Sequence, residues 1–214
     1  MSDARSQILD RIRTATGGAA APPESRREYR HHDERSHAER VELFCERVGD
    51  YQAEVKRVHR DQLRAAIRNA LKRHQAKRVA IPASFPQAWL SPSVEFIHDQ
   101  GLTARELDGF DAVVTGCSVA IAETGTIVTT GGQYEGRRLL SLVPDLHICI
   151  VSESQIVGLV PEALAQVQLL VSRQRRPLTF ISGPSATSDI ELERVEGVHG
   201  PRKLVVLVVG EENP

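Results

Sequence analysis

One carboxylate stands out among the residues that could do chemistry. Glu123 lies in a turn of small residues between two apolar runs, residues 111–115 and 126–130, that are rich in β-branched side chains. Such runs are typical of strands in a covered α/β sheet, and these sheets bind ligands in the loops at strand ends. We therefore expect Glu123 at a sheet edge, within reach of a ligand. An acid that only satisfies loop amides would give the same pattern.

A second turn, residues 182–189, is also rich in Gly, Ser and Thr and follows the apolar run 178–181. Amides and hydroxyls of such a turn can receive an anion. Residues Ser188 and Glu191 also fit a capping box, which satisfies the first amides of a helix without any ligand. We expect the two turns to face one crevice that binds a small anionic ligand, although ordinary connecting turns use the same residue types.

The candidate ligand-binding residues are mostly small or hydroxyl-bearing residues of these turns: Gly116, Ser118, Thr124, Gly125, Thr126, Gly183, Ser185, Thr187, Asp189 and His199. His199 would need a partner within hydrogen-bond reach to act as an acid or base, and a histidine that bonds its own turn explains it equally well. Cys117 is a candidate nucleophile, but no partner histidine is recognisable near it in the sequence.

Cofactor and metal signatures are absent from the sequence. It has neither a Gly-x-x-x-x-Gly-Lys-Ser/Thr loop nor a Gly-x-Gly-x-x-Gly motif after the first strand. Its three cysteines include no Cys-x-x-Cys pair and cannot supply a four-thiolate cluster. His31, His32 and His37 lie in a polar segment that we expect to be solvent-exposed. We predict no intrinsic cofactor and no metal site.

Charge and hydropathy argue against a nucleic-acid-binding protein and against a membrane-spanning or secreted one. The formal net charge of -1 argues against nucleic acid as the main partner, because binding to a phosphate backbone requires a basic excess or a basic face. No apolar run approaches the roughly 18 residues that span a bilayer. The first residues also lack the hydrophobic core of a secretory signal. These features predict a cytoplasmic protein without a membrane span.

The pattern of apolar residues divides the chain into two parts. Residues 1–36 comprise a short amphipathic helix, with Ile8, Leu9 and Ile12 on one side, and a flexible linker. Residues 37–214 alternate between helical and strand-like periodicity. Helices are predicted from residue 37, from Asp61 as the capping residue, and over 156–171 with Pro161 in a first turn. Strands are predicted at 54–58, 78–81, 94–97, 111–115, 126–130, 146–151, 178–181 and 203–209.

This alternation indicates an α/β fold with three layers, helix on sheet on helix. The sheet is expected to be mixed and mostly parallel, with some antiparallel pairing near Thr126. The run 203–209 is continuously apolar and therefore reads as a buried strand.

Four motifs taken in order resemble the LUD-domain family: Thr115-Gly-Cys-Ser118, Ala122-Glu-Thr-Gly-Thr126, residues 182–191 and Gly197-Val-His-Gly-Pro201. The similarity covers about residues 38–210. It implies a fold similar to the sugar-phosphate isomerase and CoA-transferase group, and a role beside two iron–sulfur proteins that oxidise L-lactate to pyruvate. Because this chain lacks cluster thiolates, it would be the cluster-free subunit, with iron–sulfur clusters only in its partners. Homo-oligomerisation is left open.

The motif around Glu123 supports an alternative. Ala122-Glu-Thr-Gly125 resembles the Ser-Glu-Asn-Gly element of certain CoA-transferases, in which the glutamate is acylated, but Ala and Thr replace Ser and Asn. The resemblance implies that Glu123 would be the catalytic nucleophile of an acyl-transfer enzyme. A subunit that binds a small anion or supports assembly, without catalysis of its own, is the interpretation we favour, since fold-level analogy is a poor guide to chemistry.

Overall fold

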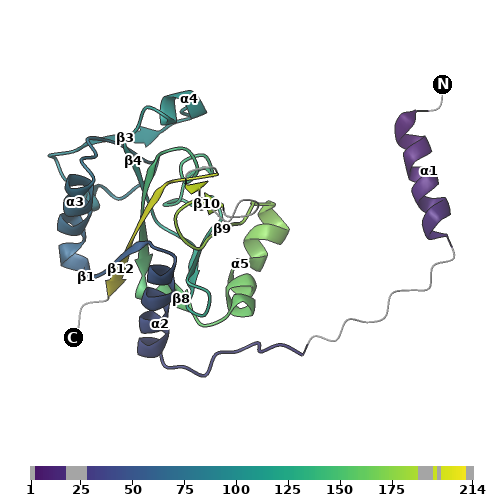
Figure 1. Cartoon of the computed structure of the whole chain (residues 1–214), viewed down its shortest axis with the longest axis horizontal. Coiled ribbons are helices and arrows are strands. Elements are labelled where there is room, and N and C mark those ends of the chain that lie inside the picture. Colours follow the sequence, from purple (N-terminus) through teal and green to yellow (C-terminus); the bar gives the residue numbers. More distant parts are fainter. Residues whose placement is uncertain (1–2, 18–27, 188–194, 197–198, 211–214) are drawn as a thin grey trace.

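A sheet of six parallel strands forms the centre of the molecule, in the order β1-β12-β7-β4-β2-β3 (Figure 1). The computed structural model describes residues 3–17, 28–187, 195–196 and 199–210. The strands are Glu54–His59 (β1), Arg78–Pro82 (β2), Glu95–Asp99 (β3), Ala112–Thr115 (β4), Leu146–Ser152 (β7) and Lys203–Gly210 (β12). β7 and β12 lie inside the sheet with both faces covered, which explains their continuously apolar sequences. β1 is an edge strand.

A second sheet of four strands packs beside the first, in the order β8-β5-β6-β9. Its strands are Val119–Ile121 (β5), Thr126–Thr129 (β6), Ile156–Val157 (β8) and Thr179–Ile181 (β9). β5 and β6 form an antiparallel hairpin, and β9 pairs antiparallel with β6, so the predicted antiparallel pairing near Thr126 is confirmed. A further antiparallel pair joins Ala186–Thr187 (β10) to Val195–Glu196 (β11).

Helices cover both sheets in layers (Figure 1). Helix α3 (Leu63–Arg73) packs its apolar face, including Ile67 and Leu71, on one side of the central sheet. Helix α2 (His37–Asp50) and the second sheet cover the other side, where Phe44 meets Val206 and Ile127 in one apolar cluster. Helix α5 (Val160–Gln174) covers the outer face of the second sheet. The short helix α4 (Ala104–Leu107) packs near β2 and β4.

The predicted α/β class, with a mostly parallel central sheet flanked by helices, is therefore confirmed. The structure adds the second sheet between the central sheet and α5. Capping explains where α2 begins, because the Ser36 hydroxyl accepts from the amide of Glu39 and the Glu39 carboxylate accepts from the amide of Ser36.

Two predicted helix details are wrong. Asp61 does not cap α3, because residues Arg60–Gln62 form a 3₁₀ turn and no side chain caps the helix. The predicted apolar face of residues 156–171 also breaks up. Ile156 belongs to strand β8, which precedes the helix, and pairs there with Ala120 of β5. Leu164 lies in α5 but is 43% exposed. Pro161 does lie in the first turn of α5, as predicted.

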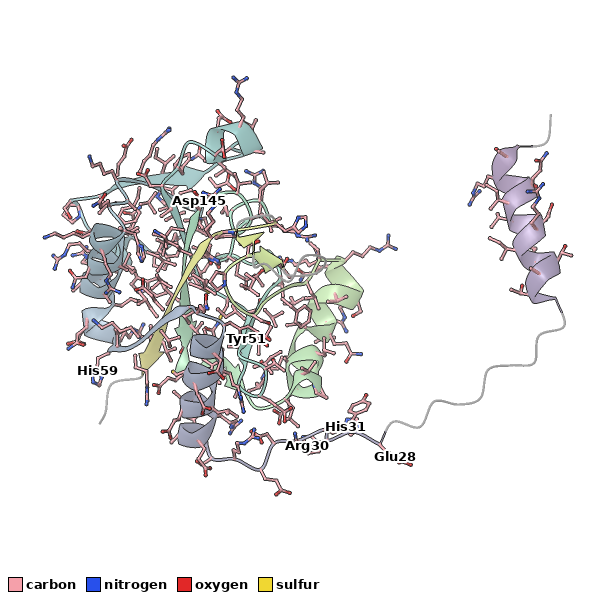
Figure 2. The ribbon with its side chains drawn as sticks, in the orientation of Figure 1. Glu28, Arg30, His31, Tyr51, His59 and Asp145 are labelled. Atoms are coloured by element: carbon pink, nitrogen blue, oxygen red, sulfur yellow. The ribbon has the colours of Figure 1, made fainter. Side chains whose placement is uncertain are left out.

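The N-terminal helix α1 (Ala4–Thr16) forms as predicted, and none of its residues is buried. Residues 28–36, which the sequence assigns to the linker, contact the α/β body. The Asp33 amide donates to the Glu162 carboxylate, and the Asp33 side chain is only 3% exposed. A side chain at Gly158 would collide with Asp33. Figure 2 shows Arg30 and His31 on this segment, on the way from α1 to α2.

Candidate functional site

The structure places the candidate residues in three separate regions. Gly116 and Ser118 follow β4, at the carboxyl end of the central sheet. Residues 123–126 form the turn of the β5–β6 hairpin. Gly183, Ser185 and His199 lie near the end of α2, where they line a shallow cavity together with Tyr51. Tyr51 is labelled at that end of the helix in Figure 2.

Glu123 projects from the hairpin turn toward α5. Its amide donates to the carbonyl of Gly158 at 3.0 Å, and its carboxylate pairs with the Arg30 guanidinium. The side chain is 37% exposed. It borders a cavity of about 880 Å³ that runs along α5 and is lined mainly by apolar side chains, among them Leu164 and Val171. The chemistry available here is that of a carboxylate already neutralised by a cation.

A row of hydroxyls connects the hairpin turn to the second turn. Thr124 Oγ1 lies 2.7 Å from Thr126 Oγ1, which lies 2.8 Å from Ser182 Oγ. The contact follows from the pairing of β6 with β9, which brings the start of one strand beside the end of the other. The two turns therefore meet at this point, but Glu123 and Gly183 border different cavities.

Gly125 and Gly183 make room for protein rather than for a ligand. Gly125 has φ +58°, and a Cβ there would lie 2.7 Å from the carbonyl carbon of Arg47. Gly183 has φ +144°, and its Cβ would lie 2.6 Å from the Cβ of Tyr51. The last turn of α2 occupies the space at Gly125, and its C-cap residue Tyr51 occupies the space at Gly183. The sequence shows that a close approach occurs at these glycines but not which group makes it.

Ser185 of the second turn bonds the segment that carries His199. The Ser185 amide donates to the Pro201 carbonyl at 2.8 Å, and the His199 amide donates to Ser185 Oγ at 3.0 Å. These bonds join the second turn to residues 199–201 through backbone amides and do not test the role of the His199 imidazole. Thr187 contributes its backbone to β10. Asp189 and the predicted capping box at 188–191 lie outside the described residues.

A crevice at the carboxyl ends of three parallel strands is the site that the topology favours. It has a volume of about 250 Å³. Residues from the ends of β4, β7 and β12 form its floor and the lower part of its walls: Gly116, Cys117, Ile150, Ser152, Val209 and Gly210. Ligands of open parallel sheets bind at this edge, outside the carboxyl ends of the strands. In Figure 2, His59 at the end of β1 marks this edge, whereas Asp145, before β7, marks the opposite one.

Side chains from loops and from the start of α3 form the walls and rim of the crevice. They are Arg60, Leu63, Trp89, Tyr134 and Gln155. The rings of Trp89 and Tyr134 lie against each other, with centroids 6.3 Å apart. Sequence reasoning missed Arg60, Trp89 and Tyr134. For Arg60 a signal existed, because it lies two residues after the strand predicted at 54–58, and residues after parallel strands gather at one edge.

A buried carboxylate holds the loop that carries Tyr134. Glu135 is 7% exposed and accepts hydrogen bonds from the Ser118 hydroxyl and from the amides of Thr130 and Gly132. The Gly116 amide donates to the Tyr134 carbonyl at 2.7 Å. Ser118 therefore positions this loop above the crevice, and Gly116 has its amide engaged as well.

The floor of the crevice is uncharged near neutral pH. The Cys117 thiol has a pKa raised well above its usual range, because it is hydrogen-bonded with Cys149 and buried, so it is a poor nucleophile. Beneath it, burial lowers the pKa of His147 to about 4. Thr115 Oγ1 donates to the Gly116 carbonyl and lies 2.8 Å from His147 Nε2, which makes that nitrogen the donor of the shared bond.

The described residues contain neither a metal-binding cluster nor a membrane-spanning helix. No group of three or more His, Cys, Asp and Glu side chains in this part of the chain is arranged to hold a metal ion. Among the helices that the structure describes, each is either too short or too polar to cross a bilayer.

Comparisons with known proteins define the class. The LUD domain matches residues 41–209. A protein of Deinococcus radiodurans named Lactate utilization protein C is 47% identical over 210 residues, which are 98% of this chain and 97% of that protein. A protein of Halalkalibacterium halodurans with the same name is 30% identical over 188 residues, 82% of this chain and 81% of that protein.

A solved structure shares the fold. The crystal structure of a DUF162 family protein from Deinococcus radiodurans is 43% identical in sequence and superposes with a TM-score of 0.72, covering 82% of this chain and 99% of that one. This chain thus belongs to the LUD-domain family, as its motifs indicated.

Proposed function

We propose that this chain acts in lactate utilisation, as the cluster-free subunit of a cytoplasmic system in which two iron–sulfur proteins oxidise L-lactate to pyruvate. The observation that carries the proposal is its similarity, over 98% of its length, to a protein named Lactate utilization protein C. The electrons of lactate would pass to clusters in the partners, since the three cysteines of this chain cannot form a four-thiolate site.

The surface along α5 supports the assembly part of this role. Leu164 and Val171, which line the larger cavity, are 43% and 37% exposed. The charged pair at its border, Arg30 and Glu123, is mutually neutralised. Contiguous exposed apolar surface of this kind marks contacts between proteins. We infer that an iron–sulfur partner covers this groove.

A second candidate function is acyl transfer. The observation that favours it is the exposure of Glu123 at the border of the same cavity, where a thioester could reach it. The carboxylate would attack the thioester carbonyl and release the CoA thiolate, leaving a mixed anhydride. The thiolate would then attack the glutamyl carbonyl and release the product carboxylate, leaving glutamyl-CoA. Arg30 would have to leave the carboxylate before the first step.

Lactate-dependent dye reduction tests the favoured role. The purified chain alone should give no reduction, and addition of the two iron–sulfur proteins should produce it. Activity of the chain by itself, free of those partners, would contradict the proposal.

The same assay tests whether an iron–sulfur partner binds in the groove along α5. Leu164→Asp places a charge on the exposed apolar surface and should weaken assembly at least about tenfold, as central interface residues do. Gln166→Asp is the matched control, because Gln166 is exposed on α5 but does not line the cavity. Equal behaviour of the two variants would place the partner elsewhere.

A further inference from the structure

The rim of the 250 Å³ crevice carries hydrogen-bond donors that the protein does not use. Within the described part of the chain, the Arg60 guanidinium, the Trp89 indole N–H and the Tyr134 hydroxyl make no hydrogen bond or ion pair. Arg60 is exposed, whereas Trp89 is half-buried against the rings of Phe85 and Tyr134. An arginine and two aromatic donors around one opening form a site that attracts an acceptor.

No carboxylate competes for these donors. The crevice lining that the structure describes contains no Asp or Glu. Of the acids on adjoining elements, Asp61 lies next to Arg60 but does not line the crevice, Glu153 is bound by the Arg57 guanidinium at 2.7 and 3.1 Å, and Glu135 accepts from Ser118 and backbone amides. Cys117 and His147 below the floor are uncharged near neutral pH, because their pKa values are shifted in the directions that favour the neutral forms. The field inside the opening is set by Arg60, which selects an anion.

The size and walls of the crevice narrow the class of anion. Its volume of about 250 Å³ lies below the range of about 300–1,000 Å³ that is typical of sites for drug-sized ligands. A nucleotide or CoA would not fit inside it. Leu63, Ile150 and Val209 supply apolar walls beside the polar rim. A ligand with a charged head of few atoms and a short apolar body matches this combination, whereas inorganic phosphate would leave the apolar walls without a partner.

We propose that this crevice binds a small organic carboxylate, and that Arg60 recognises its carboxyl group. Tyr134 and Trp89, which line the same crevice, donate further hydrogen bonds to oxygens of the ligand, and the apolar walls contact its carbon chain. Arginine suits this task because its guanidinium can donate two parallel hydrogen bonds to one carboxylate. The inference rests on the proposed function only for the choice of L-lactate as a probe. The site itself stands on the geometry of the crevice.

Trp89 provides a local readout, because it is the only tryptophan of the chain. Titration of the full-length protein with L-lactate, acetate or inorganic phosphate at low ionic strength, followed by intrinsic fluorescence and calorimetry, reports binding at the crevice. We expect saturable binding of a carboxylate, weaker binding of phosphate, and at least a tenfold rise in Kd for Arg60→Gln. Arg60→Lys should recover part of the affinity, because it restores the charge but not the paired donors.

Arg68→Gln is the matched control, since Arg68 is exposed on α3 outside the crevice and its loss changes the net charge by the same amount. It should leave Kd unchanged. Equal effects of Arg60→Gln and Arg68→Gln, tighter binding of phosphate than of either carboxylate, or no carboxylate binding up to about 10 mM, where a binding free energy would be under about 3 kcal/mol, would each overturn the inference.

The binding experiment and the lactate oxidation assay can fail independently of each other. Carboxylate binding that depends on Arg60, in a protein that fails to support lactate oxidation by its partners, would keep the site and remove the proposed function. Reconstituted oxidation that is unchanged by Arg60→Gln, together with no carboxylate binding, would remove the site and keep the function.

Discussion

The groove along α5 and the crevice at the carboxyl ends of the parallel strands differ in chemistry as well as in size. The groove along α5 has a volume of about 880 Å³, but its walls are apolar and the charged pair at its border, Arg30 and Glu123, is self-contained. The crevice at the carboxyl ends of the parallel strands has about 250 Å³, and three donors on its rim have no partner among the residues that the structure describes. The groove, whose charges are already paired, suits contact with an apolar surface of another protein. The crevice, whose rim donors are unpaired, suits a ligand with hydrogen-bond acceptors.

The glycine-containing turn beside each cavity also has a different role: one packs against a helix, and the other faces the crevice. The hairpin turn at residues 123–126 contains a carboxylate and small residues, as a binding turn would, but α2 fills the space beside Gly125. The loop after β6 has a less suggestive sequence and yet places Tyr134 over the crevice through the bonds of Glu135. Composition alone does not say which turn faces solvent and which faces a helix.

The largest expected effect tests the packing role of the hairpin turn. Gly125→Ala forces a side chain into a positive-φ position 2.7 Å from the Arg47 backbone and should lower the free energy of unfolding by about 2–4 kcal/mol. Urea denaturation measures this loss. Gly49→Ala is the control, because a Cβ there meets nothing within 4 Å, and it should stabilise α2 by up to about 1 kcal/mol. A stable Gly125→Ala variant with altered carboxylate binding would reverse the assignment of the two regions.

An intermediate effect concerns the layer beneath the crevice. His147 has its pKa lowered from 6.5 to about 4 by burial, so the unfolded chain takes up a proton before the folded one. The stability from this neutral histidine is present above pH 6.5 and is lost as the pH falls toward 4. Between pH 7 and pH 4.5 the loss should be roughly 2–3 kcal/mol.

Urea denaturation at those two pH values measures the loss, with His147→Gln and His59→Gln compared to the parent. Replacement of His147 should reduce the pH dependence by that amount. Replacement of His59, which is exposed at the end of β1, should not. If both variants kept the full pH dependence, acid sensitivity would come from carboxylates rather than from this buried layer.

The smallest expected effect is at the border of the groove. Glu123→Gln removes an exposed ion pair and should change the unfolding free energy by less than about 1 kcal/mol. We also expect no covalent mass addition when the parent protein is incubated with acyl-CoA donors and trapped, as an assembly surface requires. An adduct of CoA mass on Glu123 that disappears in the variant would instead establish the acyl-transfer alternative and make the groove a substrate site.

Long apolar runs made much of the fold predictable. The sequences of β7 and β12 are continuously apolar and were predicted as strands. The apolar stripe that includes Ile67 and Leu71 identified helix α3. β5 and β8 escaped prediction because they have three and two residues, too few to show a period. Their identity is set by pairing with each other and with β6, which is a tertiary property.

The site was predictable only in part, for a related reason. Residue types indicated hydroxyl-rich turns, and the junction between Thr126 and Ser182 shows that the two turns do meet. The direction in which Gly183 faces depends on α2, more than a hundred residues earlier. Arg60 follows β1 and Trp89 follows β2 of the parallel sheet, whereas Tyr134 follows β6 of the second sheet. The three residues carry no shared motif, so only the packing of the two sheets reveals that they converge.

The position of β12 has a consequence for synthesis of the protein. This last described strand lies between β1 and β7. Residues 54–59 therefore cannot pair within the sheet until residues 203–210 have been synthesised. A nascent chain lacking β12 would leave β1 detached and one side of β7 open, with unpaired backbone groups on both. The central sheet therefore closes late during translation, and truncation before Lys203 would split it rather than shorten it.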